Sequence, residues 1–237
     1  MKGLIALVGA GEYLPVMDEV DRRLLASVNT NGRVPNVVCL PTAAGQEGEE
    51  SVGRWLKMGE EHFKGLGAQV YPLPIIDRTS ADDPQFEPIL ESADLIYFSG
   101  GNPLYLFETM NGSRAWTAAQ TAWARGAVYA GCSAGAMILA KRLPNFRRIG
   151  LGTVDGFGIM PADYVMPHFN NAGPFRVFVN LLRKGMKDSE YMLGIDENTA
   201  LVGQLGGKWQ VLGESKVHLL TRKSTRTFAV GESLLLQ

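Results

Sequence analysis

The sequence has little of several residue types, and each scarcity excludes a class of protein. Only two cysteines, Cys39 and Cys132, occur in 237 residues, which excludes a disulfide framework and a cysteine-rich zinc site. Lys and Arg number 23 against 24 Asp and Glu. The chain therefore lacks the basic excess typical of nucleic-acid binders, and we expect no nucleic-acid partner. Hydrophobic residues still make up 46% of the chain, enough to build a folded core.

Long apolar runs are missing as well. Only the five residues at positions 4–8 form an apolar run near the N-terminus, and a secretory signal needs a longer one. The longest uncharged stretch, 126–140, contains three glycines and is too short to span a bilayer. We expect a cytoplasmic protein with no membrane partner.

Apolar strand-like runs alternate with helical patterns through the first two-thirds of the chain. This alternation predicts a mostly parallel sheet with helices on both faces, an α/β three-layer sandwich. After about Tyr191 short strands follow one another directly, and we interpret them as an antiparallel extension of the same sheet within a single domain, 1–237. The expected strands are 3–8, 36–40, 69–73, 95–99, 127–130, 191–195, 201–204, 209–212, 216–220 and 227–230, with helices starting at Pro15, Ser51 and Ser113.

The segment 127–137 carries the clearest chemical signal. Gly131-Cys132-Ser133-Ala134-Gly135 fits the pattern Gly-x-Ser-x-Gly directly after a strand and before a helical pattern, which is the setting of a nucleophile elbow. The two glycines permit a tight turn that exposes the serine oxygen. Ser133 is therefore a candidate nucleophile. The alternative is a close-packed turn in which Ser133 only caps a helix.

A second glycine turn could supply backbone hydrogen-bond donors. Ser99-Gly100-Gly101-Asn102 ends a strand, and Pro103 then opens a helix. Paired glycines let N–H groups approach a ligand closely, as an oxyanion hole requires. An ordinary strand-to-helix connection has the same pattern, so these residues alone leave both interpretations open.

A nucleophilic serine needs a base, and the chain has three histidines. His62 lies in a helical pattern and suits a surface or boundary position. His218 lies inside a late strand and suits a structural role. His168 follows Pro167 at the end of a short apolar strand, where catalytic side chains are commonly placed, and is the candidate base.

These motifs resemble those of peptidase family S51, which includes aspartyl dipeptidase and cyanophycinase, within the class I glutamine amidotransferase-like fold. The resemblance implies a hydrolase without a cofactor that cleaves a peptide or amide bond in a small substrate. It makes Ser133 the nucleophile and His168 the general base. It also implies an oxyanion hole from the N–H groups of Gly101 and Ala134. The matching segments are 40–43, 98–102, 131–136, 156–161 with 167–169, and 194–200.

Two substrate-binding candidates accompany this resemblance. Family members that favour Asp-containing substrates use arginines after the catalytic histidine, and Arg176 stands in that region. A solvated helix arginine is the alternative interpretation of Arg176. Asn102, at the end of the glycine turn, is the second candidate.

The third member of the triad is open at this point. The resemblance implies an acid between the serine and the histidine, but 141–153 contains no Asp or Glu, and the first acid is Asp155. Class I amidotransferases place the acid two residues after the histidine, where this chain has Asn170. We expect the carbonyl oxygen of Asn170, or the carboxylate of Asp155, to accept the second ring N–H of His168.

Other interpretations compete with a serine hydrolase. The vacant acid position motivates a catalytically weak or silent small-molecule binding module on the same fold. A cysteine-dependent amidotransferase-like enzyme would use Cys132, although the elbow centres on Ser133 and directs Cys132 inward. Gly9-Ala10-Gly11 begins a dinucleotide fingerprint, but Leu14 occupies the third glycine position, so we expect no nucleotide. No metal site is expected, and a homodimer is possible.

Overall fold

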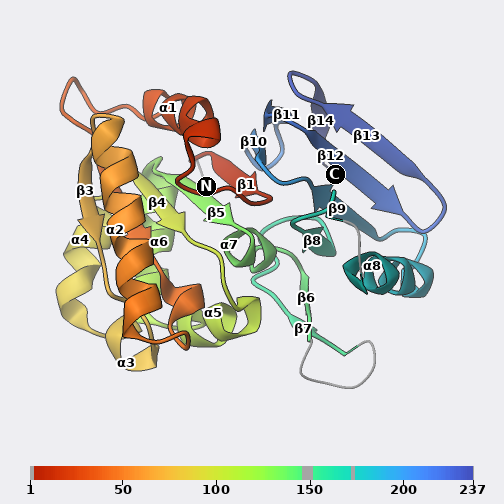
Figure 1. The fold of residues 1–237 in the computed structure, drawn as a ribbon, viewed down its shortest axis with the longest axis horizontal. Helices are drawn as coiled ribbons and strands as arrows, with labels where there is room; N and C mark the ends of the chain where they lie inside the picture. Colours follow the sequence, from red (N-terminus) through yellow and green to blue (C-terminus); the bar gives the residue numbers. More distant parts are fainter. Residues whose placement is uncertain (1–2, 146–151, 172–173, 237) are drawn as a thin grey trace.

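A central eight-stranded sheet organises the structure, a computed structural model that describes residues 3–145, 152–171 and 174–236, without the side chains of 174–176. Its strands are β1 (Ile5–Val8), β2 (Asn36–Leu40), β3 (Gln69–Pro72), β4 (Leu95–Phe98), β5 (Val128–Cys132), β10 (Thr199–Gly203), β11 (Lys208–Gly213) and β14 (Ser233–Leu235). They lie in the order β14-β11-β10-β1-β5-β4-β2-β3 (Figure 1). The strands from β1 to β3 in this order are parallel, and β10, β11 and β14 are antiparallel. The expected mostly parallel α/β sheet is confirmed.

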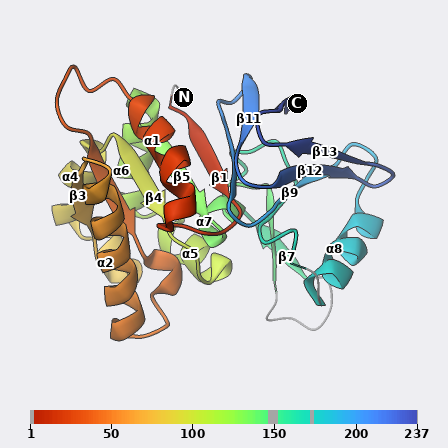
Figure 2. The same cartoon turned by 45° about the horizontal axis from the view of Figure 1, so that its top comes forward.

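Helices cover both faces of the parallel strands because alternate side chains of a strand point to opposite faces. In β2, for example, Val37 and Cys39 belong to one buried cluster, whereas Val38 and Leu40 belong to another. The first face is covered by α1 (Asp18–Ala26) and α2 (Glu49–Gly65), which lie together in Figure 2. The second face is covered by α3 (Arg78–Ala81), α4 (Glu87–Glu91), α5 (Pro103–Met110), α6 (Arg114–Arg125) and α7 (Ala134–Met137). Single 3₁₀ turns occur at Pro15–Met17, Thr42–Ala44 and Pro84–Phe86.

The late strands divide between two sheets, which corrects the expectation of one continuous extension. The second sheet has the order β13-β12-β9-β8, and α8 (Pro174–Gly185) packs against it through Val179 and Leu182. The chain leaves β9 for the first sheet at 196–198 and returns after β11 at 214–215, so neighbours in sequence alternate between sheets. The second sheet comprises β8 (Tyr164–Met166), β9 (Tyr191–Ile195), β12 (Lys216–Thr221) and β13 (Thr225–Ala229), and a separate hairpin pairs β6 (Arg142–Pro144) with β7 (Thr153–Asp155).

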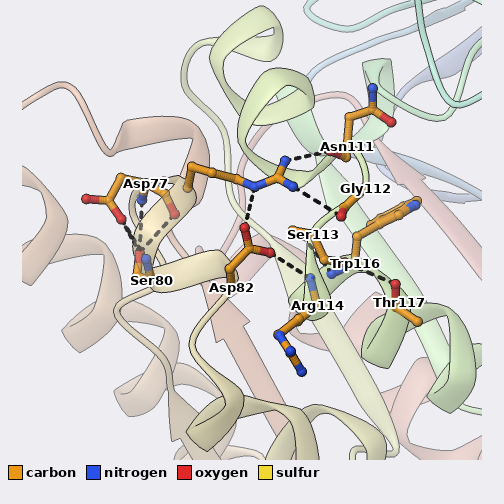
Figure 3. A network of polar contacts seen from close by, with 10 residues as sticks. Asp77, Ser80, Asp82, Asn111, Gly112, Ser113, Arg114, Trp116 and Thr117 are labelled. Carbon is orange, nitrogen blue, oxygen red and sulfur yellow. Dashed lines mark hydrogen bonds and ion pairs between the residues drawn. The ribbon is translucent and has the colours of Figure 1, made fainter.

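The expected helix start at Ser113 is confirmed. The Ser113 hydroxyl accepts the N–H of Trp116 at 3.0 Å and caps α6, as Ser commonly does. The Asp82 carboxylate, at the end of α3, accepts the N–H of Arg114 at 3.1 Å (Figure 3). These contacts fix the beginning of α6 and hence its packing against the sheet, on the far side from α1 and α2. None of the helices in the described part of the chain is long and apolar enough to cross a membrane.

Candidate active site

Ser133 occupies a sharp turn between β5 and α7. Its backbone has φ 49° and ψ −105°, a conformation that residues with a side chain rarely adopt and that is typical of functional turns. The turn is possible because its flanking residues are glycines. A Cβ at Gly131 would lie 2.3 Å from the Gly135 carbonyl oxygen, and one at Gly135 would lie 2.6 Å from the Phe98 oxygen. The half-buried Ser133 side chain thus stands at the carboxyl end of the parallel strands, as expected for an elbow.

The glycine turn after β4 lies beside this serine. Gly101 has φ 140°, and a Cβ there would lie 2.5 Å from the Ala43 carbonyl oxygen, so only glycine fits. In the described part of the chain, neither the Gly101 N–H nor the Ala134 N–H donates a hydrogen bond to another protein group. Both donors therefore remain free for a ligand oxygen. Asn102 instead caps α5, because its side-chain oxygen accepts the N–H groups of Leu104 and Tyr105 at 3.1 Å each. Whether Asn102 also contacts substrate stays a prediction.

His168 reaches the serine from the second sheet. Its Nε2 lies 3.2 Å from Ser133 Oγ, and its Nδ1 lies 2.8 Å from Glu197 Oε1. Strands β8 and β9 are parallel neighbours, so the residues that follow their carboxyl ends, His168 and Glu197, lie side by side. With Nδ1–H donating to the carboxylate, Nε2 offers a lone pair to the serine hydroxyl. Serine, histidine and carboxylate therefore form a hydrogen-bonded chain with the same connectivity as a Ser-His-Asp triad.

Glu197 therefore occupies the position that the sequence suggested for Asn170 or Asp155, and that expectation is wrong. The Asn170 side-chain oxygen accepts the N–H of Glu197 at 2.9 Å, so it holds the backbone of the acid and not the imidazole ring. Asp155 lies exposed on β7, in register with Arg142 of β6. Glu197 could have been found from its place directly after the buried strand 191–195, within the segment 194–200 that resembles the family.

Glu197 and His168 are both accessible, with side chains 39% and 42% exposed. Accessibility matters because a substrate and a water molecule must reach the imidazole. His168 has φ 51°, so two of these three residues, Ser133 and His168, adopt a rarely occupied backbone conformation. Such strain is commonly maintained at functional sites, where the surrounding structure enforces it.

The surroundings of Cys132 disfavour nucleophilic attack, although it adjoins Ser133. It is fully buried, and its thiol donates to Glu12 Oε2 at 2.9 Å. Burial and the nearby Glu12 charge raise the pKa of the Cys132 thiol well above its usual value. Because the thiolate is the reactive form of cysteine, this environment suppresses cysteine chemistry. The other cysteine, Cys39, is also buried, and burial raises its pKa to about 12.

Arg176 is the remaining sequence candidate. Arg176 belongs to α8, but its side chain lies outside the described residues, so its role in binding stays a prediction. Within residues 3–145, 152–171 and 174–236, no three His, Cys, Asp or Glu side chains gather in a way that could hold a metal ion.

Comparison with known proteins shows which family the chain belongs to. The sequence profile described as peptidase family S51 matches residues 5–209. The chain belongs to peptidase family S51. Cyanophycinase from Synechococcus elongatus is 24% identical to it over 232 residues, which cover 92% of this chain and 68% of that relative. The resemblance found in the sequence is thereby confirmed.

Two solved structures resemble this S51 chain along nearly its whole length. A crystal structure of a peptidase from an acI-B1 Actinobacterium is 38% identical and covers 99% of this chain and 97% of its own, with a TM-score of 0.88. A putative peptidase E protein from Listeria monocytogenes EGD-e is 19% identical, covers 98% of this chain and 100% of its own, and has a TM-score of 0.60. The second likeness concerns the fold alone. Family membership supports a peptidase function.

Proposed function

We propose that this S51 chain is a serine-type peptidase that cleaves a peptide or amide bond in a small substrate through an acyl-enzyme on Ser133. The observation that carries the proposal is the hydrogen-bonded chain from Ser133 Oγ through both ring nitrogens of His168 to Glu197. In this proposal His168 is the general base, Glu197 orients it, and the N–H groups of Gly101 and Ala134 bind the oxyanion.

Acylation begins when Ser133 Oγ attacks the substrate carbonyl carbon and its proton passes to His168 Nε2. The carbonyl π electrons move to the oxygen, whose negative charge the Gly101 and Ala134 N–H groups stabilise. Collapse of the tetrahedral intermediate breaks the C–N bond, and the amine leaves with the proton from His168. The Glu197 carboxylate stabilises the imidazolium that exists between these two proton transfers.

Deacylation repeats these steps with water. His168 removes a proton from a water molecule as its oxygen attacks the acyl carbon, and the second tetrahedral intermediate uses the same two backbone donors. When the bond from the acyl carbon to Ser133 Oγ breaks, the proton on His168 passes to that oxygen and regenerates the hydroxyl. The acid product and the free enzyme result, and neither a metal nor a cofactor enters the balance.

Two alternatives considered from the sequence have less support. The silent binding module was motivated by a vacant acid position, and Glu197 now lies at that position, 2.8 Å from His168. The cysteine-dependent reaction would need a thiolate at Cys132, whose burial and Glu12 contact favour the neutral thiol.

A fluorophosphonate probe followed by intact-mass measurement tests the proposal. We expect one adduct, located at Ser133 by peptide mapping, because the probe phosphorus reacts with an activated serine oxygen and releases fluoride. Ser133→Ala should abolish the adduct, whereas Cys132→Ala, the adjacent control, should still be labelled at Ser133. Iodoacetamide should leave both cysteines of the folded protein unmodified. An iodoacetamide adduct at Cys132 with loss of activity would support the cysteine-dependent alternative, and a folded chain that takes up no probe would support the binding module.

A further inference from the structure

A buried carboxylate lies directly behind the candidate nucleophile, and the mechanism above does not use it. Glu12 belongs to the turn after β1, and only 9% of its surface is exposed. Its Oε1 accepts the N–H of Gly100 at 2.9 Å, and its Oε2 accepts the Cys132 thiol at 2.9 Å. One side chain thus connects the two loops that carry the proposed oxyanion donors and the nucleophile.

Among the described residues, Glu12 differs from the other buried acids, each of which pairs with an Arg or a His. Within the described residues no Lys, Arg or His forms an ion pair with it. Removing a carboxylate from water is costly unless hydrogen bonds replace its hydration. Here the two donors are a backbone N–H and a thiol, and hydrogen bonds to an ionised acceptor are stronger than neutral ones. The free-energy cost of burying the Glu12 carboxylate points to a role beyond packing.

One contact of Glu12 holds the peptide group just before the proposed oxyanion donor, the Gly101 N–H. The Gly100 N–H is bonded to Glu12, and the Asn102 N–H is bonded to the Ala43 oxygen at 2.8 Å. The Gly101 N–H lies between these two fixed groups and remains free. On the other loop, the Ser133 N–H donates to the Val8 oxygen at 2.9 Å, and the neighbouring Ala134 N–H remains free. Each free donor therefore follows a residue whose position is fixed by a hydrogen bond.

Glu12, the Gly100 turn and Ser133 lie next to one another. A Cβ built on Gly100 would lie 2.9 Å from Glu12 Oε1, 3.3 Å from Ser133 Cβ and 3.8 Å from Ser133 Oγ. The adjoining residue Tyr13 adds a second contact with the same loop, because its hydroxyl lies 3.2 Å from Ser99 Oγ. Tyr13 also has φ 63°, so the turn that brings both side chains beneath the loop is itself strained.

We propose that Glu12 is a positioning residue that sets the distance between the free Gly101 N–H and Ser133 Oγ by bonding Gly100 and Cys132 at once. This inference rests on the proposed serine mechanism. Because the transition state requires donors placed within a fraction of an ångström, a loop displaced by about 1 Å can reduce the rate about 100-fold. Binding of the probe before reaction does not depend on this placement.

The test separates reaction from binding in the fluorophosphonate assay, by measuring the limiting rate of labelling (kinact) and the probe concentration at half that rate (KI). Glu12→Ala should reduce kinact about 100-fold and leave KI within about twofold. Glu12→Asp keeps the charge but is one methylene too short to reach both donors, and it should reduce kinact about tenfold or more. Glu12→Gln keeps an oxygen for the Gly100 N–H and should restore kinact to within about tenfold of wild type.

Asp94→Asn is the matched control. Asp94 is a buried carboxylate just before β4, whereas Gly100 lies just beyond the other end of the same strand. It pairs with Arg33 and accepts the Asn36 N–H, so its loss should lower the melting temperature without changing kinact. Amide hydrogen exchange of the peptide containing 99–102 should become faster in Glu12→Ala and remain unchanged in Asp94→Asn.

The outcomes are distinguishable. Labelling of a folded Glu12→Asp or Glu12→Ala protein at the wild-type kinact would overturn the positioning role and leave the serine mechanism intact. If Glu12→Ala does not fold, Glu12→Asp and Glu12→Gln decide by their order of kinact. Absence of labelling in the wild-type protein would instead contradict the serine mechanism, and the exchange measurement would then decide whether Glu12 holds the loop, with unchanged exchange in the Glu12 variants overturning the proposal.

Discussion

His168 and His62 lie against carboxylates at the same distance, yet their surroundings differ. Each has one ring nitrogen 2.8 Å from an oxygen, of Glu197 and Asp21 respectively. The His62 pair is enclosed between α1 and α2, with side chains 6% and 1% exposed, and its other nitrogen lies 3.7 Å from a second carboxylate, Asp18. The other nitrogen of His168 lies 3.2 Å from a hydroxyl, Ser133 Oγ. A histidine–carboxylate pair alone is thus no sign of catalysis.

His218 supports the same conclusion from the second sheet. Its Nε2 lies 3.1 Å from Asp196 Oδ1, and its Nδ1 lies 3.1 Å from Thr227 Oγ1. Both ring nitrogens of His218 therefore have partners. Neither partner is a candidate nucleophile on a sharp turn, as Ser133 is. Asp196 also accepts the Ser215 hydroxyl at 2.7 Å, so this pair holds the end of β9 just before Glu197. The two less exposed pairs join neighbouring elements of the fold, whereas the His168–Glu197 pair is the most exposed of the three.

Substitution of the histidines provides the largest contrast. We expect His168→Ala to reduce the rate of fluorophosphonate labelling at least about 10³-fold, because the serine loses its base. His62→Ala should label at the wild-type rate but unfold about 3 kcal/mol more easily, because it leaves Asp21 buried without its partner. Labelling rates and thermal unfolding of both variants measure this contrast. Equal labelling of His168→Ala and wild type would remove His168 from the mechanism.

Substitution of the paired acids should give a smaller contrast. Glu197→Gln keeps the shape of the side chain but loses the charge that stabilises the imidazolium. In the serine-protease template such a change costs about 10⁴ in turnover, and we expect a loss of about 10²–10⁴ here because the pair is more exposed. A labelling rate within a factor of two of wild type would show that another group orients His168.

Asp21→Asn is the control for that experiment, and its effect should concern stability alone. Burial raises the pKa of the Asp21 carboxyl, against the hydrogen bond from His62. The folded state therefore holds the Asp21 proton more tightly than the unfolded chain, whose value is near 3.9. This contribution is present at low pH and is lost as the pH rises through the folded pKa. In denaturant titrations, the free energy of unfolding of wild type relative to that of Asp21→Asn should fall as the pH rises through the folded pKa of Asp21. The rate of fluorophosphonate labelling should not change.

The two turns that hold Ser133 and Gly101 were predictable from the sequence because their signals are local. A strand, a Gly-x-Ser-x-Gly turn and a helix follow one another within a dozen residues at 127–137. The same steric rules that make glycine necessary at Gly131 and Gly101 can be applied to sequence alone. The alternation of strands and helices likewise predicts a parallel sheet, since parallel neighbours need a crossover between them.

The carboxylate that contacts His168 and the second sheet were not predictable because they depend on which strands pair. His168 and Glu197 are 29 residues apart, and they meet only because β8 and β9 are adjacent and parallel. Strands β9 to β13 have similar local patterns, and nothing in those patterns says that the chain changes sheet at 196–198 and again at 214–215. Short-range rules selected the histidine that lies beside Ser133 but sought its partner near it in sequence, at Asn170 and Asp155.

The smallest expected effect is that of substituting Asn170. This substitution tests how firmly the His168–Glu197 pair is held. The Asn170 side-chain oxygen accepts the Glu197 N–H at 2.9 Å, at an exposed position where water can replace it. Asn170→Ala should therefore reduce the labelling rate only about three- to tenfold, equivalent to about 0.6–1.4 kcal/mol. Asn171→Ala is the matched control, because this exposed neighbour forms no side-chain hydrogen bond within the described residues and should label as wild type does. A loss of 100-fold or more in Asn170→Ala would mean that the amide acts on His168 or the substrate directly. Equal rates for both variants would mean that the strand pairing of β8 and β9 is enough to place Glu197.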